Sequence, residues 1–439
     1  MAWRDADRSH RDPLRHALAS DFQETTFTGD ADFQMATFTS RVLFGRTTFT
    51  GDADLYGATF LDDATFDGAR FETASKLGPL ACGGTVALDG AVFDVPVTLE
   101  IAARAVSLTG ARWVSKATLR LRYAELNLSD AVLEYPVTVT AHPKPFPLSG
   151  ETVSEGELTG RDDGVRLTSV SGVDTAYLAL YDIDLSACRF AGAVHLDQLR
   201  VDGWCTFAAA PVGWDRRFPW RWSRRRALAE EHDWRARSRR WSCGWAVPPQ
   251  DAPVLRPAVL AALYRQLRKG LEDGKNEPGA ADFYFGECEM RRHDKDNTFL
   301  AERILLTGYW ALSGYGLRAS RALAWLGTAM TATVAALMLW GLPADDPKPE
   351  ITGRQVEAGQ AVTLTTDTPD ARNPTDRLIE RMTTERFEKS LRVVINSVVF
   401  RSSGQNLTTA GTYSEMASRL MEPVLLGFAV LAIRNRVKR

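Results

Sequence analysis

The sequence predicts an all-β right-handed β-solenoid followed by an α-helical neck and two transmembrane helices. Three observations predict this architecture: large apolar residues recur near the N-terminus in steps of five and six, a helix pair follows, and two apolar runs lie near the C-terminus. The chain has 439 residues, 45% apolar and 25% charged, which is typical of a folded protein with several structural units. Its five cysteines have no CxxC spacing, which argues against a disulfide framework and a zinc site.

The N-terminal repeat defines the solenoid. TFTGDADF at 26–33 returns as TFTGDADL at 48–55, 22 positions later. A helix needs apolar spacings of three and four and a strand needs two, so steps of five and six indicate a chain that turns a corner after each short extended segment. Repetition at this period is typical of a solenoid, whose large side chains stack from coil to coil. The expected core residues are Phe22, Phe27, Phe33, Phe38, Phe44, Phe49, Leu55, Phe60, Phe66 and Phe71.

The repeat continues with a shorter period. Triplets of apolar residues begin at Leu88, Leu108 and Leu128, which are 20 residues apart, and a last triplet begins at Leu185. An insertion at about 151–164 separates the last triplet from the others. We expect the coils to stack roughly 4.8 Å apart through backbone pairing.

The repeat unit resembles that of the pentapeptide-repeat family, Ala-(Asp/Asn)-(Leu/Phe)-x-x. The matching segments are AlaAspPheGlnMet at 31–35, AlaThrPheThrSer at 36–40 and AlaAspLeuTyrGly at 53–57. The resemblance covers somewhat under half of the chain, and the six-residue steps depart from strict repeats of five. It implies a solenoid that serves as a recognition surface and not as a catalytic one.

The first repeats are acidic. Residues 20–75 contain ten Asp or Glu against three Arg. The family resemblance allows one interpretation, a rod that imitates DNA and occupies a topoisomerase. A solvated outer face that keeps the rod soluble is the alternative.

A basic, tryptophan-rich segment follows at 214–245, with ten arginines, four acidic residues and six tryptophans. Arginines interleaved with aromatic rings suit lipid head groups, nucleic-acid phosphates or cation–π packing. A helix that caps the open end of the solenoid accounts for the same residues, so these alternatives remain open. The predicted basic patch consists of Arg224, Arg225, Arg226, Arg235, Arg237, Arg239 and Arg240.

The helical neck is predicted from PAVLAALYRQLRKGLED, with leucines at helical spacing, and from a GKNEPG turn before a second helix at about 280–293. Phe283, Cys288 and Met290 are expected to face the first helix. Glu289 and His293 lie four apart and invite a metal assignment, but a third ligand is missing. We therefore predict a solvated face and no metal there.

Two apolar runs predict transmembrane helices. Residues 322–344 carry no charge and are long enough to span a bilayer, and residues 304–317 suit a helix lying at the interface. The second run, 423–433, must begin near Tyr413 to span, and it then includes Glu415, Arg419 and Glu422. These three residues share a helix face, where they can pair with one another, and polar groups at that depth need a protein or water neighbour.

Arginines before the first span and the basic C-terminus, RNRVKR, place both ends of the chain in the cytoplasm by the positive-inside rule. Residues from about 345 to 414 then lie outside. On this topology, a cysteine placed near Thr363 should be labelled from outside, whereas Cys82 should not.

The order of span, amphipathic helix, polar loop and second span resembles the two-helix pore domain of potassium channels. The filter signature Thr-Val-Gly-Tyr-Gly is absent, so a pore would use a non-standard loop. The segment from the neck to the second span also resembles actinobacterial membrane proteins with pentapeptide repeats. The possible pore-loop residues are Ser402, Ser403, Gly404, Gln405, Thr408, Thr409 and Gly411.

These patterns divide the chain into ten segments. They are an N-terminal tail (1–20), the solenoid (21–210), an Arg/Trp-rich cap or membrane-surface segment (211–253), a cytoplasmic helical hairpin (254–303), an interfacial helix (304–320), transmembrane helix 1 (321–343), an extracytoplasmic loop (344–385), a pore-helix-like segment and loop (386–413), transmembrane helix 2 (414–433) and a basic cytoplasmic tail (434–439).

Catalytic signatures such as GxSxG, HExxH and the phosphate-binding glycine loops are absent. We therefore predict a non-catalytic protein with no cofactor and no metal, in the bacterial inner membrane as a multi-pass chain. The expected partners are membrane lipid, a protein partner and a second copy of the chain, and nucleic acid is not expected. The hypotheses, in order, are a membrane-anchored recognition scaffold, a pore with a solenoid sensor, and a DNA mimic that binds a topoisomerase.

Overall fold

The computed structural model describes residues 20–211, 224–237, 245, 254–344, 350–353, 364–367, 373–375, 377–399 and 407–437. These residues belong to two compact units, Met1–Thr298 and Phe299–Arg439, and each unit is considered by itself.

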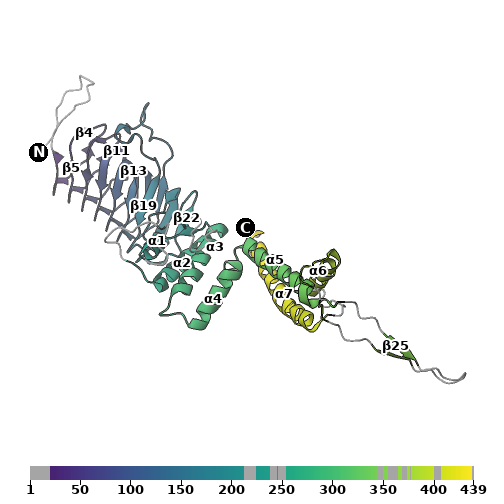
Figure 1. The fold of residues 1–439 in the computed structure, drawn as a ribbon. Coiled ribbons are helices and arrows are strands. Elements are labelled where there is room, and N and C mark those ends of the chain that lie inside the picture. Colours follow the sequence, from purple (N-terminus) through teal and green to yellow (C-terminus); the bar gives the residue numbers. More distant parts are fainter. Residues whose placement is uncertain are drawn as a thin grey trace. The chain divides into compact units, whose positions relative to one another are not determined.

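Unit 1 begins with a parallel β-solenoid of about eight turns, in which each strand pairs with a strand one turn later (Figure 1). The largest sheet has 14 strands: β1 (Ser20–Asp21), β4 (Thr37–Phe38), β5 (Val42–Leu43), β8 (Thr59–Phe60), β9 (Ala64–Thr65), β11 (Lys76–Ala87), β13 (Val97–Ser107), β15 (Ala117–Arg122), β16 (Glu125–Asn127), β18 (Val137–Ala141), β19 (Val165–Ser169), β20 (Leu178–Tyr181), β21 (Ile183–Asp184) and β22 (Arg200–Asp202). A second sheet has six: β2 (Thr26–Phe27), β6 (Thr48–Phe49), β10 (Arg70–Phe71), β12 (Val92–Phe93), β14 (Arg112–Trp113) and β17 (Val132–Leu133). A further pair consists of β3 (Ala31–Asp32) and β7 (Ala53–Asp54).

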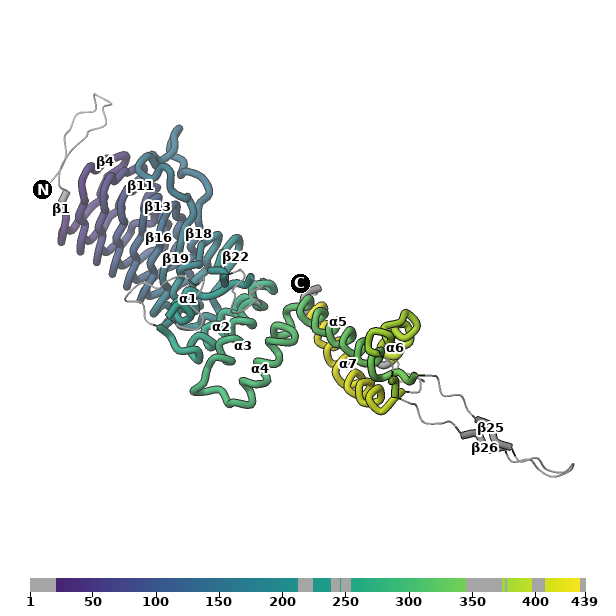
Figure 2. Tube along the Cα trace, in the orientation of Figure 1, coloured from purple at the N-terminus to yellow at the C-terminus, as the bar shows by residue number. Residues whose placement is uncertain are grey.

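The strand register reproduces the period of the sequence. Thr26 pairs with Thr48, and Thr48 pairs with Arg70, so each coil here has 22 residues. Val92 pairs with Arg112, which gives a coil of 20 residues. The prediction of a parallel solenoid with these two periods is confirmed, and the stacked coils are visible as parallel loops of the chain in Figure 2.

Aromatic rings fill the interior by stacking along the solenoid. In one column Phe27, Phe49, Phe71, Phe93 and Trp113 follow one another with ring centroids 5.2, 5.0, 5.0 and 5.8 Å apart and nearly parallel planes. The spacing follows from strand pairing, because side chains at one register position must lie one strand separation apart. Of the ten expected core residues, six are buried: Phe44, Phe49, Leu55, Phe60, Phe66 and Phe71. Those of the first coil are half-buried: Phe22, Phe27, Phe33 and Phe38.

Aspartates hold the corners of the coils. The side chains of Asp21, Asp32, Asp54 and Asp184 each accept a hydrogen bond from the backbone N–H two residues later, at 2.9–3.1 Å. This local contact stabilises a turn in the way that Asx turns do. The acidic character of these repeats therefore has a structural cause in the corners themselves.

A long excursion leaves the solenoid between β18 and β19, from His142 to Gly164, and contains the short helix η1 (Gly156–Leu158). Its apolar side chains Phe146, Val153 and Leu158 are buried against Ala81 and Ala102 of the coils. The predicted start near Glu151 is wrong, since the excursion begins at His142. The repeat spacing could not show the earlier start, because the buried residue Phe146 does not follow that spacing.

Helices cover the C-terminal end of the solenoid. They are α1 (Ala229–Ala236), α2 (Pro257–Asp273) and α3 (Glu277–His293). The antiparallel strand pair β23 (Ala208–Ala209) and β24 (Arg226–Ala227) belongs to the same region, and the short helix η2 (Thr175–Tyr177) lies in the last coils. The ring of Phe283 lies 4.9 Å from that of Phe207, which packs on Phe190. The expected neck is therefore a cap, and its apolar residues belong to the same core as the solenoid.

Unit 2 is helical. Its elements are α4 (Leu300–Ser313), α5 (Ala319–Ala336), the π-helical turn η3 (Leu337–Gly341), the antiparallel pair β25 (Glu350–Gly353) and β26 (Leu364–Asp367), α6 (Thr384–Val399) and α7 (Thr409–Val437). The segments Ala319–Gly341 and Thr409–Arg434 are long and apolar enough to cross a membrane, by length and composition. α5 and α7 lie side by side in Figures 1 and 2, and α6 packs on both.

Candidate functional site

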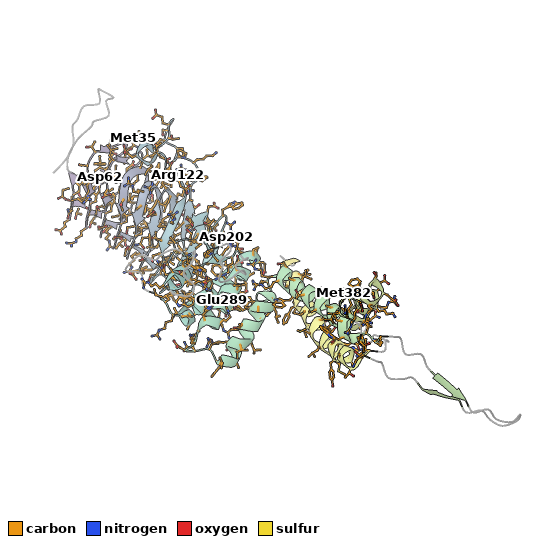
Figure 3. All side chains as sticks on the ribbon, viewed as in Figure 1. Met35, Asp62, Arg122, Asp202, Glu289 and Met382 are labelled. Atoms are coloured by element: carbon orange, nitrogen blue, oxygen red, sulfur yellow. The ribbon has the colours of Figure 1, made fainter. Side chains whose placement is uncertain are left out.

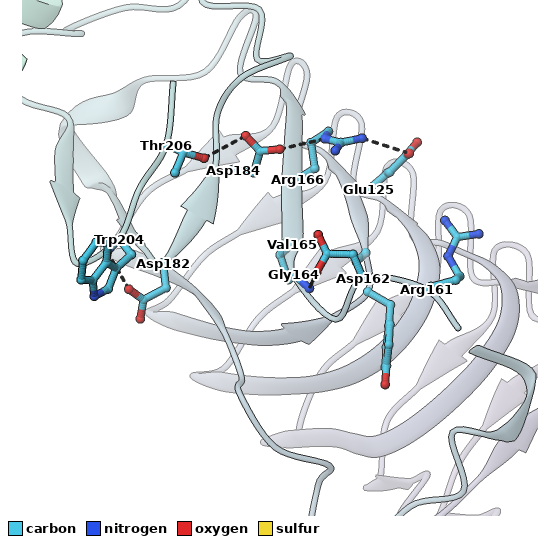
Figure 4. Close-up of a pocket in the computed structure, with 12 residues that line it drawn as sticks. Glu125, Arg161, Asp162, Gly164, Val165, Arg166, Asp182, Asp184, Trp204 and Thr206 are labelled. Atoms are coloured by element: carbon cyan, nitrogen blue, oxygen red, sulfur yellow. Dashed lines mark hydrogen bonds and ion pairs between the residues drawn. The ribbon is translucent and has the colours of Figure 1, made fainter. Parts of the chain in front are cut away.

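A surface pocket of about 210 Å³ lies on the C-terminal coils of the solenoid (Figure 4). Three successive strands of one column, β16, β19 and β21, supply Glu125, Arg166 and Asp184 to it. The excursion adds Arg161 and Asp162, and the loop after β22 adds Trp204 and Thr206. The pocket therefore forms where the inserted segment rejoins the regular coils.

A row of alternating charges runs along one side of the pocket. Arg166 donates from Nε to Asp184 at 3.0 Å, and its Nη1 lies 3.9 Å from Glu125. The hydroxyl of Thr206 donates to the other oxygen of Asp184 at 3.0 Å. Stacked strands bring residues of neighbouring coils into this contact because their side chains share one register position.

Hydrogen bonding favours the charged forms of Arg166 and Asp184. The hydrogen bond to Asp184 raises the pKa of Arg166, an effect that exceeds the opposing effect of partial burial. Burial raises the pKa of Asp184, but hydrogen bonds from Ser186, Arg166 and Thr206 together lower it below its usual value. Arg166 and Asp184 therefore form a charged pair at neutral pH.

An exposed tryptophan forms the other end of the pocket. The side chain of Trp204 is 88% exposed, and its backbone N–H donates to Oδ1 of Asp182 at 2.7 Å. Asp182 and Gly203 have φ values of +59° and +67°, so both adopt the left-handed conformation. The hydrogen bond joins two successive coils and holds Trp204 beside Asp182 (Figure 4).

A buried network supports the base of the excursion. Arg122 is 3% exposed; it donates to Glu155 at 2.8 Å and to the backbone oxygen of His142 at 2.7 Å. Tyr123, which lines the pocket, donates from its hydroxyl to Glu155 at 2.9 Å. Figure 3 marks Arg122 on the solenoid. These contacts fix the excursion against the coils that carry the pocket.

The sequence did not reveal this pocket. Its residues come from 123–125, 161–166, 182–184 and 204–206, and no repeat spacing relates the excursion to the coils. The one signal was Trp204, a large aromatic residue next to a glycine and outside the apolar steps of the repeat.

Two arginines of the predicted basic patch belong to an internal charge cluster. Arg225 and Arg235 are buried, and both donate to Glu231, at 2.5 and 2.6 Å. Tyr264 donates to the second oxygen of Glu231 at 2.5 Å, so α1 is tied to α2. Arg224 and Arg237 are exposed and Arg226 is half-buried, whereas Arg239 and Arg240 lie outside the described residues.

Electrostatics explain why these charges tolerate burial. Burial raises the pKa of Glu231, but the positive charges of Arg225 and Arg235 outweigh that effect and lower the pKa to about 2. Of the alternatives for the Arg/Trp segment, the solenoid cap accounts for Arg225 and Arg235, which are buried.

The prediction of a solvated face at Glu289 and His293 is wrong. Glu289 is buried and pairs with Arg235 at 3.1 Å and with Arg292 at 2.7 Å, as part of the cap that Figure 3 marks at Glu289. The sequence missed this because the arginine partner lies on α1, more than fifty residues away in the chain. No group of three side chains suited to a metal occurs among the residues described.

The polar residues of the second apolar run divide between two contacts. Arg419 donates to Glu415 at 2.7 Å, as an i, i+4 pair on α7. Glu422 is fully buried and accepts a hydrogen bond from Thr333 of α5 at 2.9 Å. The expected pairing thus holds for Glu415 and Arg419, whereas Glu422 joins the two helices instead.

The described part of the expected pore loop packs inside unit 2. Thr408 is 1% exposed, and its hydroxyl donates to the backbone oxygen of Trp340 at 2.7 Å. Gly411 lies against Gly341 so closely that a Cβ on Gly411 would be 2.4 Å from the Gly341 oxygen. Thr408 and Gly411 therefore join the end of η3 to α7, and Thr409 is exposed; Ser402, Ser403, Gly404 and Gln405 lie outside the described residues.

An arginine that the sequence analysis did not single out contacts the C-terminal end of α5 and η3. Arg386 of α6 donates to the backbone oxygens of Met338, Leu342 and Pro343 at 2.8–3.1 Å. A guanidinium at a helix C-terminus satisfies its unpaired carbonyls and its dipole. α6 is thereby fixed to the first apolar helix through polar contacts.

Comparison with known proteins identifies the repeat. A family profile described as "Pentapeptide repeats (9 copies)" matches residues 18–59, the coils in which the aromatic columns begin. No curated protein and no solved structure matches the chain.

Proposed function

We propose that the chain is a membrane-anchored, non-catalytic scaffold that binds a protein partner through the outer surface of its solenoid. The observation that carries the proposal is the filled interior of the rod. Stacked rings such as Phe49, Phe71 and Phe93 are 0–1% exposed, so no ligand enters the coils and recognition falls to the outer surface. The similarity to pentapeptide repeats supports the same assignment.

Membrane anchoring is supported by the exposed apolar surface of unit 2. Large side chains along α5 and α7, such as Trp325, Leu420 and Val430, are 41–76% exposed, which is unfavourable in water and favourable in lipid. Arg318 and Arg321 at the start of α5 and the basic C-terminus support cytoplasmic ends. The solenoid then lies in the cytoplasm, at the inner membrane of a bacterium.

A pore is the second candidate, and the position of α6 favours it. This amphipathic helix lies between the two apolar helices in the sequence and packs on both of them, as a pore helix does. Purified chain reconstituted in liposomes should carry no ion flux if the scaffold proposal is right. A flux that Gly404→Val abolishes would favour the pore instead.

Site-specific photo-cross-linking tests the scaffold proposal. A photoreactive phenylalanine analogue is placed at exposed aromatic positions of the solenoid, Tyr135, Tyr177 or Trp204, in the full chain in its native membrane. We expect one or two positions to capture the same protein repeatedly, and the remaining position to serve as the matched control. Absence of a reproducible product from every position would contradict the proposal.

Topology is tested by cysteine labelling with a membrane-impermeant maleimide. A cysteine at Thr363, which lies outside the described residues, should be labelled in intact cells. Cys82 is unsuitable as the cytoplasmic control because it is fully buried. A cysteine at Tyr135, 52% exposed, replaces it and should be labelled only after permeabilisation.

A further inference from the structure

A turn at residues 378–382, just before α6, presents three apolar side chains on the surface of unit 2. Leu378, Ile379 and Met382 are 51%, 84% and 66% exposed, and Figure 3 marks Met382. Adjacent exposed apolar side chains form a patch, and such patches mark surfaces that meet a partner or a membrane.

Hydrogen bonds within the turn fix its shape. The N–H of Glu380 donates to the backbone oxygen of Arg377 at 2.9 Å, and the N–H of Met382 donates to that of Ile379 at 3.2 Å. The apolar side chains are therefore presented by an ordered backbone, which lowers the entropic cost of inserting them into another medium.

Arg381 ties the turn to the end of the first apolar helix. Its guanidinium donates to the backbone oxygen of Leu339 in η3 at 2.7 Å and to that of Pro374 at 3.0 Å. The apolar segment Ala319–Gly341 ends two residues after Leu339. The turn therefore lies at the level of one end of this segment.

The second apolar helix begins at the same level. The N–H of Thr408 donates to the backbone oxygen of Gly341 at 3.0 Å, and α7 begins at the next residue, Thr409. The 23 residues of Ala319–Gly341 form a helix about 34 Å long, close to the thickness of a bilayer's hydrocarbon core. When the two helices span, their paired ends lie at one surface of the bilayer, and so does the turn.

The helix after the turn has the side chains that this position requires. α6 exposes charges on one stripe, at Glu385, Glu388 and Arg392, and apolar side chains on another, at Phe387 and Ile395. Separate polar and apolar stripes are typical of a helix at the boundary between water and lipid.

An exposed tryptophan lies at the same level as the turn. Trp340 is 51% exposed and directly follows Leu339, whose backbone oxygen accepts from Arg381. Tryptophan is enriched at the level of the lipid head groups. The indole and the turn therefore favour the same occupant for this surface, which is lipid.

We propose that the 378–382 turn inserts into the boundary between head groups and acyl chains of the leaflet at this end of the two apolar helices. Arg381 is the positioning residue that sets its depth. The inference rests on the proposed membrane anchoring, by which this leaflet is the extracytoplasmic one, and it adds a shallow lipid contact to the two spans.

The test places a dansyl amino acid at Ile379 or Met382 by stop-codon suppression in the full chain, reconstituted in phosphatidylcholine nanodiscs. Its fluorescence is quenched either by a nitroxide on the acyl chain near the head group or by iodide in the water. We expect the ratio of lipid quenching to iodide quenching to be at least about threefold higher at both positions than at Glu388, the matched control on the charged stripe.

Two results would overturn the assignment. Equal ratios at Ile379, Met382 and Glu388 would place the turn in water. Protection of the turn from both quenchers would show that protein covers it, either another segment of the chain or a second copy.

Arg381→Met tests how the turn is held. The variant removes the guanidinium that reaches Leu339, so lipid quenching at Ile379 should fall by about half or more. Quenching of a probe at Leu420 of α7 should stay the same. Unchanged lipid quenching at Ile379 would overturn the positioning role of Arg381.

The probe at Leu420 also separates failure of this inference from failure of membrane anchoring. Leu420 is 76% exposed and lies well inside the apolar segment Thr409–Arg434, so a nitroxide deep in the acyl chains should quench it. If Leu420 is quenched but Ile379 and Met382 are not, the anchor stands and the inserted turn does not. If the deep nitroxide does not quench Leu420, the helix does not span and the proposed anchoring is wrong.

Discussion

At the scale of single residues, stacked aromatic side chains stabilise the solenoid. Phe49 is 1% exposed and lies between Phe27 and Phe71 in one column, at 5.2 and 5.0 Å. A ring with neighbours on both sides loses contacts on both when it is removed, and a rigid coil cannot close the resulting cavity.

Phe49→Ala should therefore destabilise the solenoid by about 3–5 kcal/mol. Phe27→Ala, in the same column but half-buried in the first coil, is the matched control and should cost about half as much or less, because a terminal coil can fray without unfolding the rest. Denaturant unfolding followed by the strand signal in circular dichroism measures both. Equal losses for the two variants would contradict the stacked column.

Cys82 illustrates how burial controls reactivity at a single position. Its thiol is fully buried and donates to the backbone oxygen of Asp62 at 3.1 Å, and burial raises its pKa to about 11. We expect Cys82 to resist maleimide at pH 7.5 in both intact and permeabilised membranes, since the thiolate is the reactive form. Rapid labelling of Cys82 in the folded chain, detected by mass spectrometry, would contradict the packing of β11.

At the scale of elements, one buried carboxylate connects the cap. Glu231 of α1 receives hydrogen bonds from Arg225, Arg235 and Tyr264. Replacing it leaves two buried arginines without their shared partner. Glu231→Gln should therefore cost about 3–5 kcal/mol of stability.

The same residue gives a pH dependence of defined sign. The pKa of Glu231 falls from an ordinary value of 4.5 to about 2 on folding, so its contribution is complete above pH 4.5 and is lost as the pH falls towards 2. Thermal unfolding of the wild type should lose more stability between pH 5 and pH 2 than that of Glu231→Gln. Glu272→Gln, at an exposed pair with Arg268, should behave as the wild type does. Identical pH profiles for wild type and Glu231→Gln would contradict the buried cluster.

Two glycines determine how closely α7 approaches η3. A Cβ at Gly411 would lie 2.4 Å from the backbone oxygen of Gly341, whereas a Cβ at Gly427 of the same helix meets nothing within 4 Å. Gly411→Ala should therefore push the elements apart and lower the thermal stability of unit 2 in detergent. Gly427→Ala should leave it unchanged or raise it by up to about 1 kcal/mol, because alanine favours helix. Equal stability of the two variants would contradict the close packing.

Sequence patterns predicted the regular elements and missed what depends on contacts between distant segments. The steps of five and six gave the solenoid, its 22- and 20-residue coils and the aromatic columns, because each coil repeats one local geometry. The leucine spacing predicted α2, the length of the uncharged run at 322–344 predicted α5, and the shorter run at 423–433, extended back to about Tyr413, predicted α7. Periodicity can be read within a short stretch of sequence, so it was enough to predict these elements.

The pocket and the charge cluster have no such local signal. Asp162 and Asp182 line one pocket only because the excursion folds back on the coils, and Glu289 meets Arg235 only because α3 packs on α1. Arg225 and Arg235 looked like part of an exposed patch because the sequence does not show that Glu231 is buried with them, or that Glu289 of α3 joins them. The turn hydrogen bonds of the corner aspartates were likewise not predicted, although their oxygens accept backbone N–H groups.

At the scale of the whole molecule, the chain combines a rod with a filled core and a unit with two apolar helices. The rod and its cap form one hydrophobic core within Met1–Thr298, and the apolar helices lie within Phe299–Arg439. This division separates recognition, assigned to the first unit, from anchoring, assigned to the second. The function that we propose requires both units in one chain.

The most direct test inserts a protease site between Thr298 and Phe299 and follows both fragments after cleavage in isolated membranes. We expect alkaline carbonate to release residues 1–298 into the supernatant with their strand-rich circular dichroism and to leave residues 299–439 in the membrane pellet. Recovery of residues 299–439 in the supernatant, or a mostly helical spectrum for residues 1–298, would contradict a β-solenoid held at a bilayer by two spanning helices.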